Sequence, residues 1–164
     1  MCIQSYLKSL QVDFEPLLHA PASSASRRAH CVHVPGINVA KSVLVKSGEA
    51  FVLTVLPATS RIDLARLSQI LESEPITLAT EDQADRIFGD CQRGALPPFG
   101  SLYGIKTFID LTLVSGLEMV CAGNQRHEGY RLRLKDYVTI ERPIQVSFAT
   151  TQQVEGSASR RRAG

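Results

Sequence analysis

The chain has 164 residues, of which 44% are hydrophobic and 21% are charged, with six phenylalanines and no tryptophan. This is ordinary globular composition, and the length suits one domain with its own core. No apolar run approaches the roughly 18 to 20 residues that span a bilayer. The N-terminal segment lacks the basic start and long apolar stretch of a signal peptide. We therefore expect a cytoplasmic protein without membrane contact.

The net charge of +2 comes from the end of the chain. Three of the eighteen basic residues are Arg160, Arg161 and Arg162, so residues 1–159 carry 15 basic against 16 acidic side chains, a balance of −1. Proteins that bind nucleic acid through non-specific phosphate contacts usually show a strong basic excess. We therefore expect residues 1–159 not to bind phosphates broadly, and we expect a disordered, solvated basic tail over residues 151–164.

Hydrophobic periodicity and turn residues predict the first elements of the chain. These are a short amphipathic helix over 2–12, an extended segment over 14–19 that is broken by Pro16, and a helix that is capped by Ser23 or Ser24 and stops before Pro35. Two β-branched, apolar runs follow at 41–46 and 50–56, with a glycine-containing connection of hairpin length. Both runs are too continuously apolar for exposed edge strands, so we expect them in the interior of a sheet.

The rest of the chain alternates helices and strands. A helix is predicted over 62–72, with Asp63 in its first turn and a buried stripe of Ile62, Leu67, Ile70 and Leu71. A strand over 76–79 and a helix over 80–89, opened by Thr80 and closed by Gly89, follow it. The last predicted elements are strands over 106–114, 118–123 and 129–134 and a short helix or turn over 135–140. Six or seven strands with about four helices in mixed order predict one α+β domain, with a central mixed sheet flanked by helices.

The four cysteines stand apart from one another, at Cys2, Cys31, Cys91 and Cys121. Without an export signal or a CxxC spacing they are expected to be free thiols. Cys121 is expected to pack as a small hydrophobe, and Cys91 lacks a neighbouring base that would make it a nucleophile. His30 and His33 flank Cys31, but no second ligand pair completes a tetrahedral site. We expect no metal and no cofactor.

Residues 93–100, RGALPPFG, place two prolines between two glycines. Proline fixes φ and removes a donor, whereas glycine lets a ligand approach the main chain closely. Such a loop could present N–H groups to an oxygen that develops negative charge, or it could be a structural crossover. The residues alone favour neither interpretation.

Lys41 opens an otherwise apolar strand. A buried ammonium is costly unless it has a partner or a task. The alternative is that its long side chain carries the charge out to solvent at the strand end.

Taken in order, AKSVLVK, FVLTVLPA, IDLARLSQIL, TLATEDQADRIFG, GALPPFG and VCAGNQRHEGYRLRLKDYV resemble the YbaK-type aminoacyl-tRNA editing domain, which also occurs as an insertion in bacterial prolyl-tRNA synthetases. The resemblance runs from about residue 14 to 148 and implies an editing domain over 1–150. It implies hydrolysis of the ester of a mischarged tRNA that carries a small amino acid such as alanine, serine or cysteine.

By this resemblance Lys41 matches the lysine that positions the substrate, and Gly94 to Pro98 matches the GxxxP loop that stabilises the carbonyl oxygen and shapes the pocket. The residues expected to contact the substrate are Ala95, Leu96, Pro97, Pro98, Phe99, Cys121, Ala122, Gly123 and His19. Some members carry an acidic residue where this chain has Arg131, so no role for that carboxylate is transferred.

Three hypotheses follow. The first is a trans-acting aminoacyl-tRNA deacylase that recognises the acceptor end locally or through a synthetase or elongation factor. The second is a non-catalytic binding module of the same fold, which engages an aminoacyl end, a nucleotide or a protein partner. The third is a thiol enzyme that uses Cys91 or Cys121.

Overall fold

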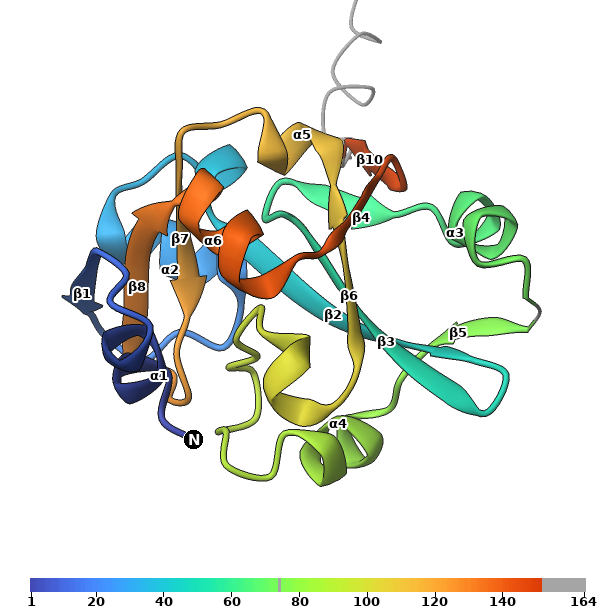
Figure 1. Ribbon diagram of the computed structural model, residues 1–164, viewed down its shortest axis with the longest axis horizontal. Coiled ribbons are helices and arrows are strands. Elements are labelled where there is room, and N and C mark those ends of the chain that lie inside the picture. Colours follow the sequence, from blue (N-terminus) through green and yellow to red (C-terminus); the bar gives the residue numbers. More distant parts are fainter. Residues whose placement is uncertain (74, 152–164) are drawn as a thin grey trace, which may run out of the picture.

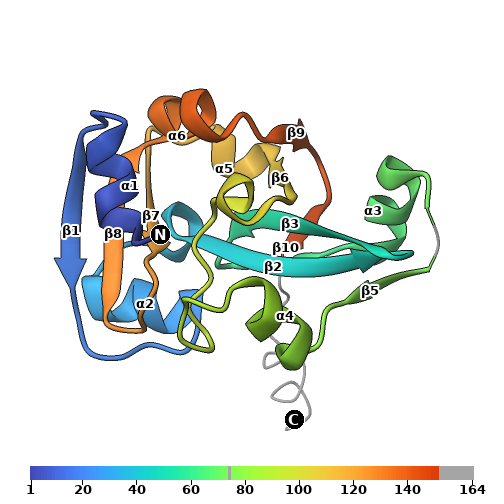
Figure 2. The ribbon, with the colours of Figure 1, turned by 60° about the horizontal axis from the view of Figure 1, so that its bottom comes forward.

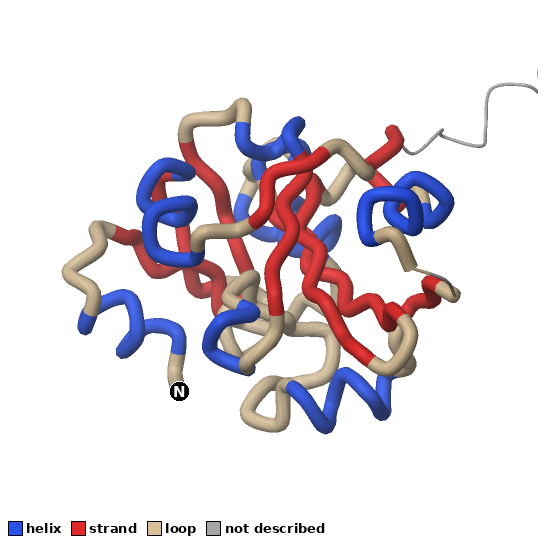
Figure 3. Tube along the Cα trace, turned by 45° about the vertical axis from the view of Figure 1, so that its right-hand side comes forward, coloured by secondary structure: helices blue, strands red, loops and turns tan. Residues whose placement is uncertain are grey.

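The computed structural model describes residues 1–73 and 75–151, in which strands run through the middle of the molecule and helices lie around them (Figure 3). The helices are α1 (Ile3–Ser9), α2 (Ala25–Val32), α3 (Leu64–Leu71), α4 (Glu81–Ile87), α5 (Leu111–Val114) and α6 (Leu134–Glu141), with short 3-10 helices η1 (Gly36–Asn38) and η2 (Gly100–Tyr103). The strands are β1 (Phe14–Leu18), β2 (Ala40–Ser47), β3 (Ala50–Pro57), β4 (Ser60–Ile62), β5 (Ile76–Leu78), β6 (Lys106–Asp110), β7 (Glu118–Ala122), β8 (Glu128–Arg133), β9 (Ile144–Val146) and β10 (Ala149–Thr151).

The central sheet has five strands in the order β5-β2-β3-β6-β9. The β2–β3 and β2–β5 pairs are antiparallel, whereas β3–β6 and β6–β9 are parallel, so the sheet is mixed. A three-stranded sheet, β1-β8-β7, lies beside it, and β10 pairs with β4 (Figure 1). The predicted α+β class with a central mixed sheet is confirmed.

The predicted hairpin is present as the antiparallel pair of β2 and β3. Leu44 pairs with Leu53 and Val45 with Val52, and both strands have neighbours on each side. Because side chains alternate between the two faces of a strand, Leu44 and Leu53 enter one hydrophobic cluster while Val45 and Val52 enter another. Both faces of the hairpin are therefore covered, which explains its continuously apolar sequence.

The larger of these clusters lies between the two sheets and also receives side chains from α1, α4, α5 and α6. The second cluster contains Leu67 of α3 and Phe148, on the opposite face of the central sheet. Figure 2 shows the β2–β3 hairpin between α4 below and α6 above. A third, smaller cluster packs α2 against Val39, Ala58 and Val120.

Three predicted elements were wrong in extent. The helix expected over 2–12 spans only Ile3–Ser9. The strand expected over 106–114 ends at Asp110, because the Asp110 carboxylate accepts a hydrogen bond from the Thr112 N–H at 3.0 Å and begins α5. The helix expected from Ile62 begins at Leu64, because Ile62 belongs to β4 and Asp63 is the N-cap residue.

The N-terminal strand also differs from the expectation, because β1 continues through Pro16. Its strand pairing is with β8, and an edge strand tolerates the missing proline donor. The short strands β4, β9 and β10 were not predicted, since three residues carry too little periodicity to be recognised. Of the predicted tail only Thr151, at the end of β10, is described; the rest lies outside the described residues. Among the described helices, none has the length and apolar character needed to cross a membrane.

Candidate functional site

A cavity of about 330 Å³ lies where α2, β2, α4 and β7 approach one another. Its walls are the start of α2, the first half of β2, the segment from the end of β5 into α4, the loop after α4, and Ala122 at the end of β7. Lys41, Gly94, Leu96 and Ala122, which the sequence predicts as site residues, all line it.

The cavity exists because β5 is shorter than β2. Since β5 pairs only with Val45 to Ser47, the first half of β2 is left along the cavity wall. The N–H of Ala79 donates to the Leu44 carbonyl at 3.0 Å, so the backbone of Leu44 faces this edge. Backbone groups two residues apart on a strand point the same way, and therefore the peptide groups of Ser42 also face the cavity edge.

The loop over residues 93–100 divides into two parts. Gly94 and Leu96 line the cavity, and the N–H of Ala95 is held inside the loop by the Gln92 carbonyl at 2.9 Å. Gly94 has φ +88°, and a Cβ there would lie 2.9 Å from the Ser23 carbonyl oxygen. Only glycine allows this close approach of the loop to the start of α2.

The second part of the loop is buried in the core. Pro97, Pro98 and Phe99 do not line the cavity. The Tyr137 hydroxyl donates to the Pro98 carbonyl at 2.6 Å, and the Phe99 ring makes edge-to-face contacts with Tyr6 and Tyr137. The loop is thus anchored in the hydrophobic core by Pro97, Pro98 and Phe99, and also by the buried Ala95.

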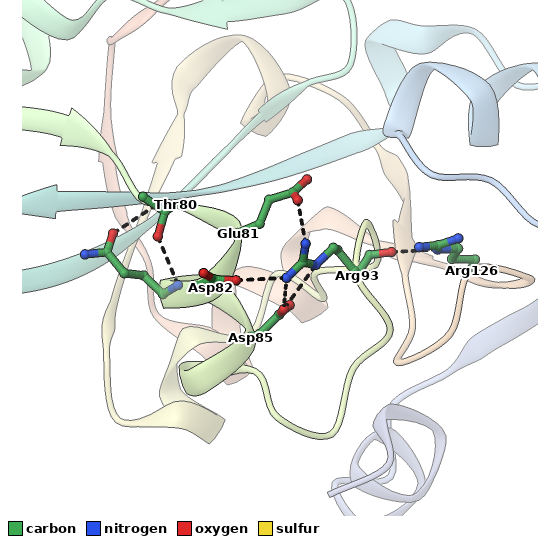
Figure 4. Close-up of polar contacts among 7 residues, drawn as sticks. Thr80, Glu81, Asp82, Asp85, Arg93 and Arg126 are labelled. Carbon is green, nitrogen blue, oxygen red and sulfur yellow. Dashed lines mark hydrogen bonds and ion pairs between the residues drawn. The ribbon is translucent and has the colours of Figure 1, made fainter.

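Arg93 ties the front of this loop to α4 (Figure 4). Its guanidinium donates to Glu81 at 2.7 Å, to Asp82 at 3.2 Å and to Asp85. The Arg93 carbonyl in turn accepts a hydrogen bond from Arg126 Nε at 2.6 Å. Because α4 starts with a capping box at Thr80, the position of the loop depends on a well-defined helix start.

Lys41 is the second residue of β2, and its side chain is half-buried. By strand alternation its side chain lies on the face opposite that of Ser42, and Nζ donates to the Ser60 carbonyl. Burial, and then the neighbouring cation of Arg61, lowers the pKa of Lys41. The lysine ammonium therefore has a backbone partner on β4, and Arg61 of the same strand is its neighbouring cation.

Arg28 and Ser42 were not among the predicted site residues, yet both line the cavity. Arg28 lies on the buried face of α2 with a side chain only 2% exposed. Its position three residues after Ala25 and next to Ala29 was the available signal, because these alanines mark the apolar stripe of the helix.

The remaining predicted residues lie outside the cavity wall. Cys121 is fully buried in the main core, where burial raises the pKa of its thiol to about 12. Gly123 donates from its N–H to the Glu128 carbonyl. His19 follows β1, and its Nδ1 lies 2.7 Å from the Ala20 carbonyl. Arg131 pairs with Glu15 at 2.8 Å on the three-stranded sheet.

The structure does not favour thiol chemistry at Cys91. Cys91 lines the cavity, but burial raises its pKa to about 11, so the thiol is protonated at neutral pH. The described residues contain no group of three or more His, Cys, Asp or Glu side chains that could hold a metal ion.

Comparison with known proteins agrees with this fold. Residues 19–140 match the family model of the aminoacyl-tRNA editing domain. The structure is similar to hypothetical protein APE2540 (TM-score 0.82, 15% identity, covering 90% of this chain and 99% of the other). It is also similar to a protein proposed to be a trans-editing enzyme for prolyl-tRNA synthetase (TM-score 0.75, 19% identity, covering 92% of this chain and 95% of the other). No curated protein sequence matches the chain at a significant level.

Proposed function

Because this chain belongs to the aminoacyl-tRNA editing domain family, we propose that it is a trans-acting deacylase that hydrolyses the ester of a mischarged tRNA carrying a small amino acid. The main support for this proposal is that Lys41 and Gly94 line the same cavity.

Hydrolysis of an aminoacyl ester does not require a nucleophilic side chain. An aminoacyl ester is already activated, so hydrolysis needs an oriented water and a site for the oxyanion more than a strong nucleophile. In the loop, Ala95 N–H is already engaged and two prolines have none. We assign the oxyanion to the backbone N–H groups of Gly94 and Leu96. Loss of one such donor typically costs roughly 10²- to 10³-fold in rate.

Lys41 is assigned to positioning the acceptor end. Lys41 and Arg61 are neighbouring cations, and as a pair they would attract the phosphates next to the terminal adenosine. The balance of −1 over residues 1–159 supplies no broader basic surface. Recognition of the rest of the tRNA is therefore assigned to a partner, an aminoacyl-tRNA synthetase or an elongation factor.

The test is a deacylation time course with purified protein and tRNAs charged with Ala, Ser, Cys, Thr, Pro or Asp. Lys41→Ala is compared with Lys46→Ala, which removes a lysine from the other end of the same strand. We expect one or two esters to be cleared by the wild type and by Lys46→Ala, and loss of activity in a folded Lys41→Ala protein. If the folded wild type hydrolyses none of them, the chain is a non-catalytic binding module instead.

A further inference from the structure

Arg28 is a buried cation without a counter-ion among the described residues. Its side chain is 2% exposed, and Nε and Nη2 are both buried with no hydrogen-bond partner. Burial lowers its pKa, and only the nearby thiols of Cys121 and Cys31 oppose this effect within the part of the chain that the structure describes. A buried, unpaired guanidinium destabilises a folded protein, so its presence calls for a group that the free protein lacks.

The same cavity holds a second unmatched polar group. Ser42 Oγ is buried and also lacks a partner, and it lies on a cavity-lining residue as Arg28 does. The two carboxylates that line the cavity, Glu81 and Asp85, are both paired with Arg93. Within the described residues, nothing on the cavity wall therefore neutralises Arg28.

Building on the proposed deacylase function, we propose that Arg28 and Ser42 form a subsite for the aminoacyl side chain, and that the preferred side chain is short and ends in a carboxylate, as in aspartate. A carboxylate offers two acceptor oxygens in the plane that a guanidinium fork matches. The Ser42 hydroxyl donates a further hydrogen bond to the same group. An apolar side chain such as that of alanine leaves both donors unmatched.

Because Arg28 is deeply buried, its ligand is the aminoacyl side chain and not a phosphate of the nucleic-acid backbone. A phosphodiester carries a nucleoside on each side, so it stays at the mouth of a cavity with a buried floor. An amino-acid side chain is a free end and can reach a guanidinium that is 2% exposed. The phosphates are assigned to the neighbouring cations Lys41 and Arg61.

The unpaired guanidinium of Arg28 destabilises the protein when no ligand is bound. Because Arg28 is unpaired without ligand, replacing it by an apolar side chain of similar length removes a desolvation cost. Arg28→Met should therefore unfold at the same temperature as the wild type or higher. A structural arginine would behave in the opposite way.

The binding experiment uses non-hydrolysable 3′-aspartylamino- and 3′-alanylamino-3′-deoxyadenosine with isothermal titration calorimetry. The wild type should bind the aspartyl compound about ten- to a hundredfold more tightly, the range that charge-assisted hydrogen bonds supply. Arg28→Met should abolish the preference, and Ser42→Ala should reduce it. Equal binding of the two compounds by the wild type, or no binding of either, overturns the subsite even if Arg28→Met fails to fold.

Hydrolysis of aspartyl-tRNA and alanyl-tRNA separates this inference from the deacylase proposal. An Arg28-dependent preference in binding without any ester hydrolysis retains the subsite and rejects the deacylase. Hydrolysis of alanyl-tRNA together with equal binding of the two compounds retains the deacylase and rejects the subsite. Faster clearance of aspartyl-tRNA, lost in Arg28→Met, supports both.

Discussion

Replacing Gly94 by alanine tests whether the loop must pass close to α2. Gly94 has φ +88°, a left-handed conformation that costs an L-residue about 1–2 kcal/mol. The new Cβ would also lie 2.9 Å from the Ser23 carbonyl oxygen and 3.2 Å from Ser23 Cα. These are backbone atoms next to the N-cap Ser24, so they do not yield as a flexible side chain would. Overpacking of this kind adds about 1–3 kcal/mol.

The matched control is Gly104→Ala. Gly104 has φ +71°, but nothing lies within 4 Å of the position that a Cβ would take there, so this variant carries the backbone strain without the clash. We expect losses in the free energy of unfolding of about 2–5 kcal/mol for Gly94→Ala and about 1–2 kcal/mol for Gly104→Ala. For a domain of this size each kcal/mol corresponds to roughly 2–4 °C in Tm.

Urea denaturation gives the stability difference, and the deacylation assay shows its effect on the site. Gly94→Ala should lose deacylation because the loop moves away from Ser23, whereas Gly104→Ala should retain it. Equal stability losses in the two variants, with activity preserved in both, would refute the argument that the glycine is required by contact with α2.

Two further predictions concern ionisable groups. Burial alone would raise the pKa of Asp110, but hydrogen bonds from Thr112 and from the backbone N–H groups of Phe148 and Ala149 hold it below its usual value. Its stabilisation is therefore complete above the unfolded pKa of about 3.9 and is lost as pH falls through the lower folded pKa. In urea denaturation across pH, the stability deficit of Asp110→Asn should shrink in acid, and a deficit independent of pH would contradict this. Because the pKa of Cys91 is about 11, iodoacetamide at neutral pH should label this thiol slowly by mass spectrometry, and Cys91→Ser should retain deacylation; inactivity of that folded variant would favour the thiol-enzyme hypothesis.

The central hairpin and the helices on either side of it could be predicted from the sequence, because their signals are local. Residues 41–56 show two β-branched runs with a glycine turn. Asp63 and Thr80 mark helix starts through side chains that accept hydrogen bonds from N–H groups three residues later. Such signals act over a few residues and need no knowledge of what lies opposite in space.

Only part of the candidate site could be predicted from such local sequence signals. The composition of RGALPPFG indicates a stiff loop with a close backbone approach, and Lys41 indicates a cation at a strand start. Which loop residues face the cavity depends on long-range contacts, since the Tyr137 hydroxyl, 39 residues away, holds the Pro98 carbonyl inside the core.

Arg28 shows the limit most clearly. In the sequence it is one of two adjacent arginines in a short helix, and either could be exposed. The packing of α2 against Val39 and Val120 turns Arg28 inward, and the short β5 leaves the cavity that it lines. Periodicity tells which face of a helix is buried, but whether a buried charge meets a partner depends on segments distant in the chain, and so on the tertiary structure alone.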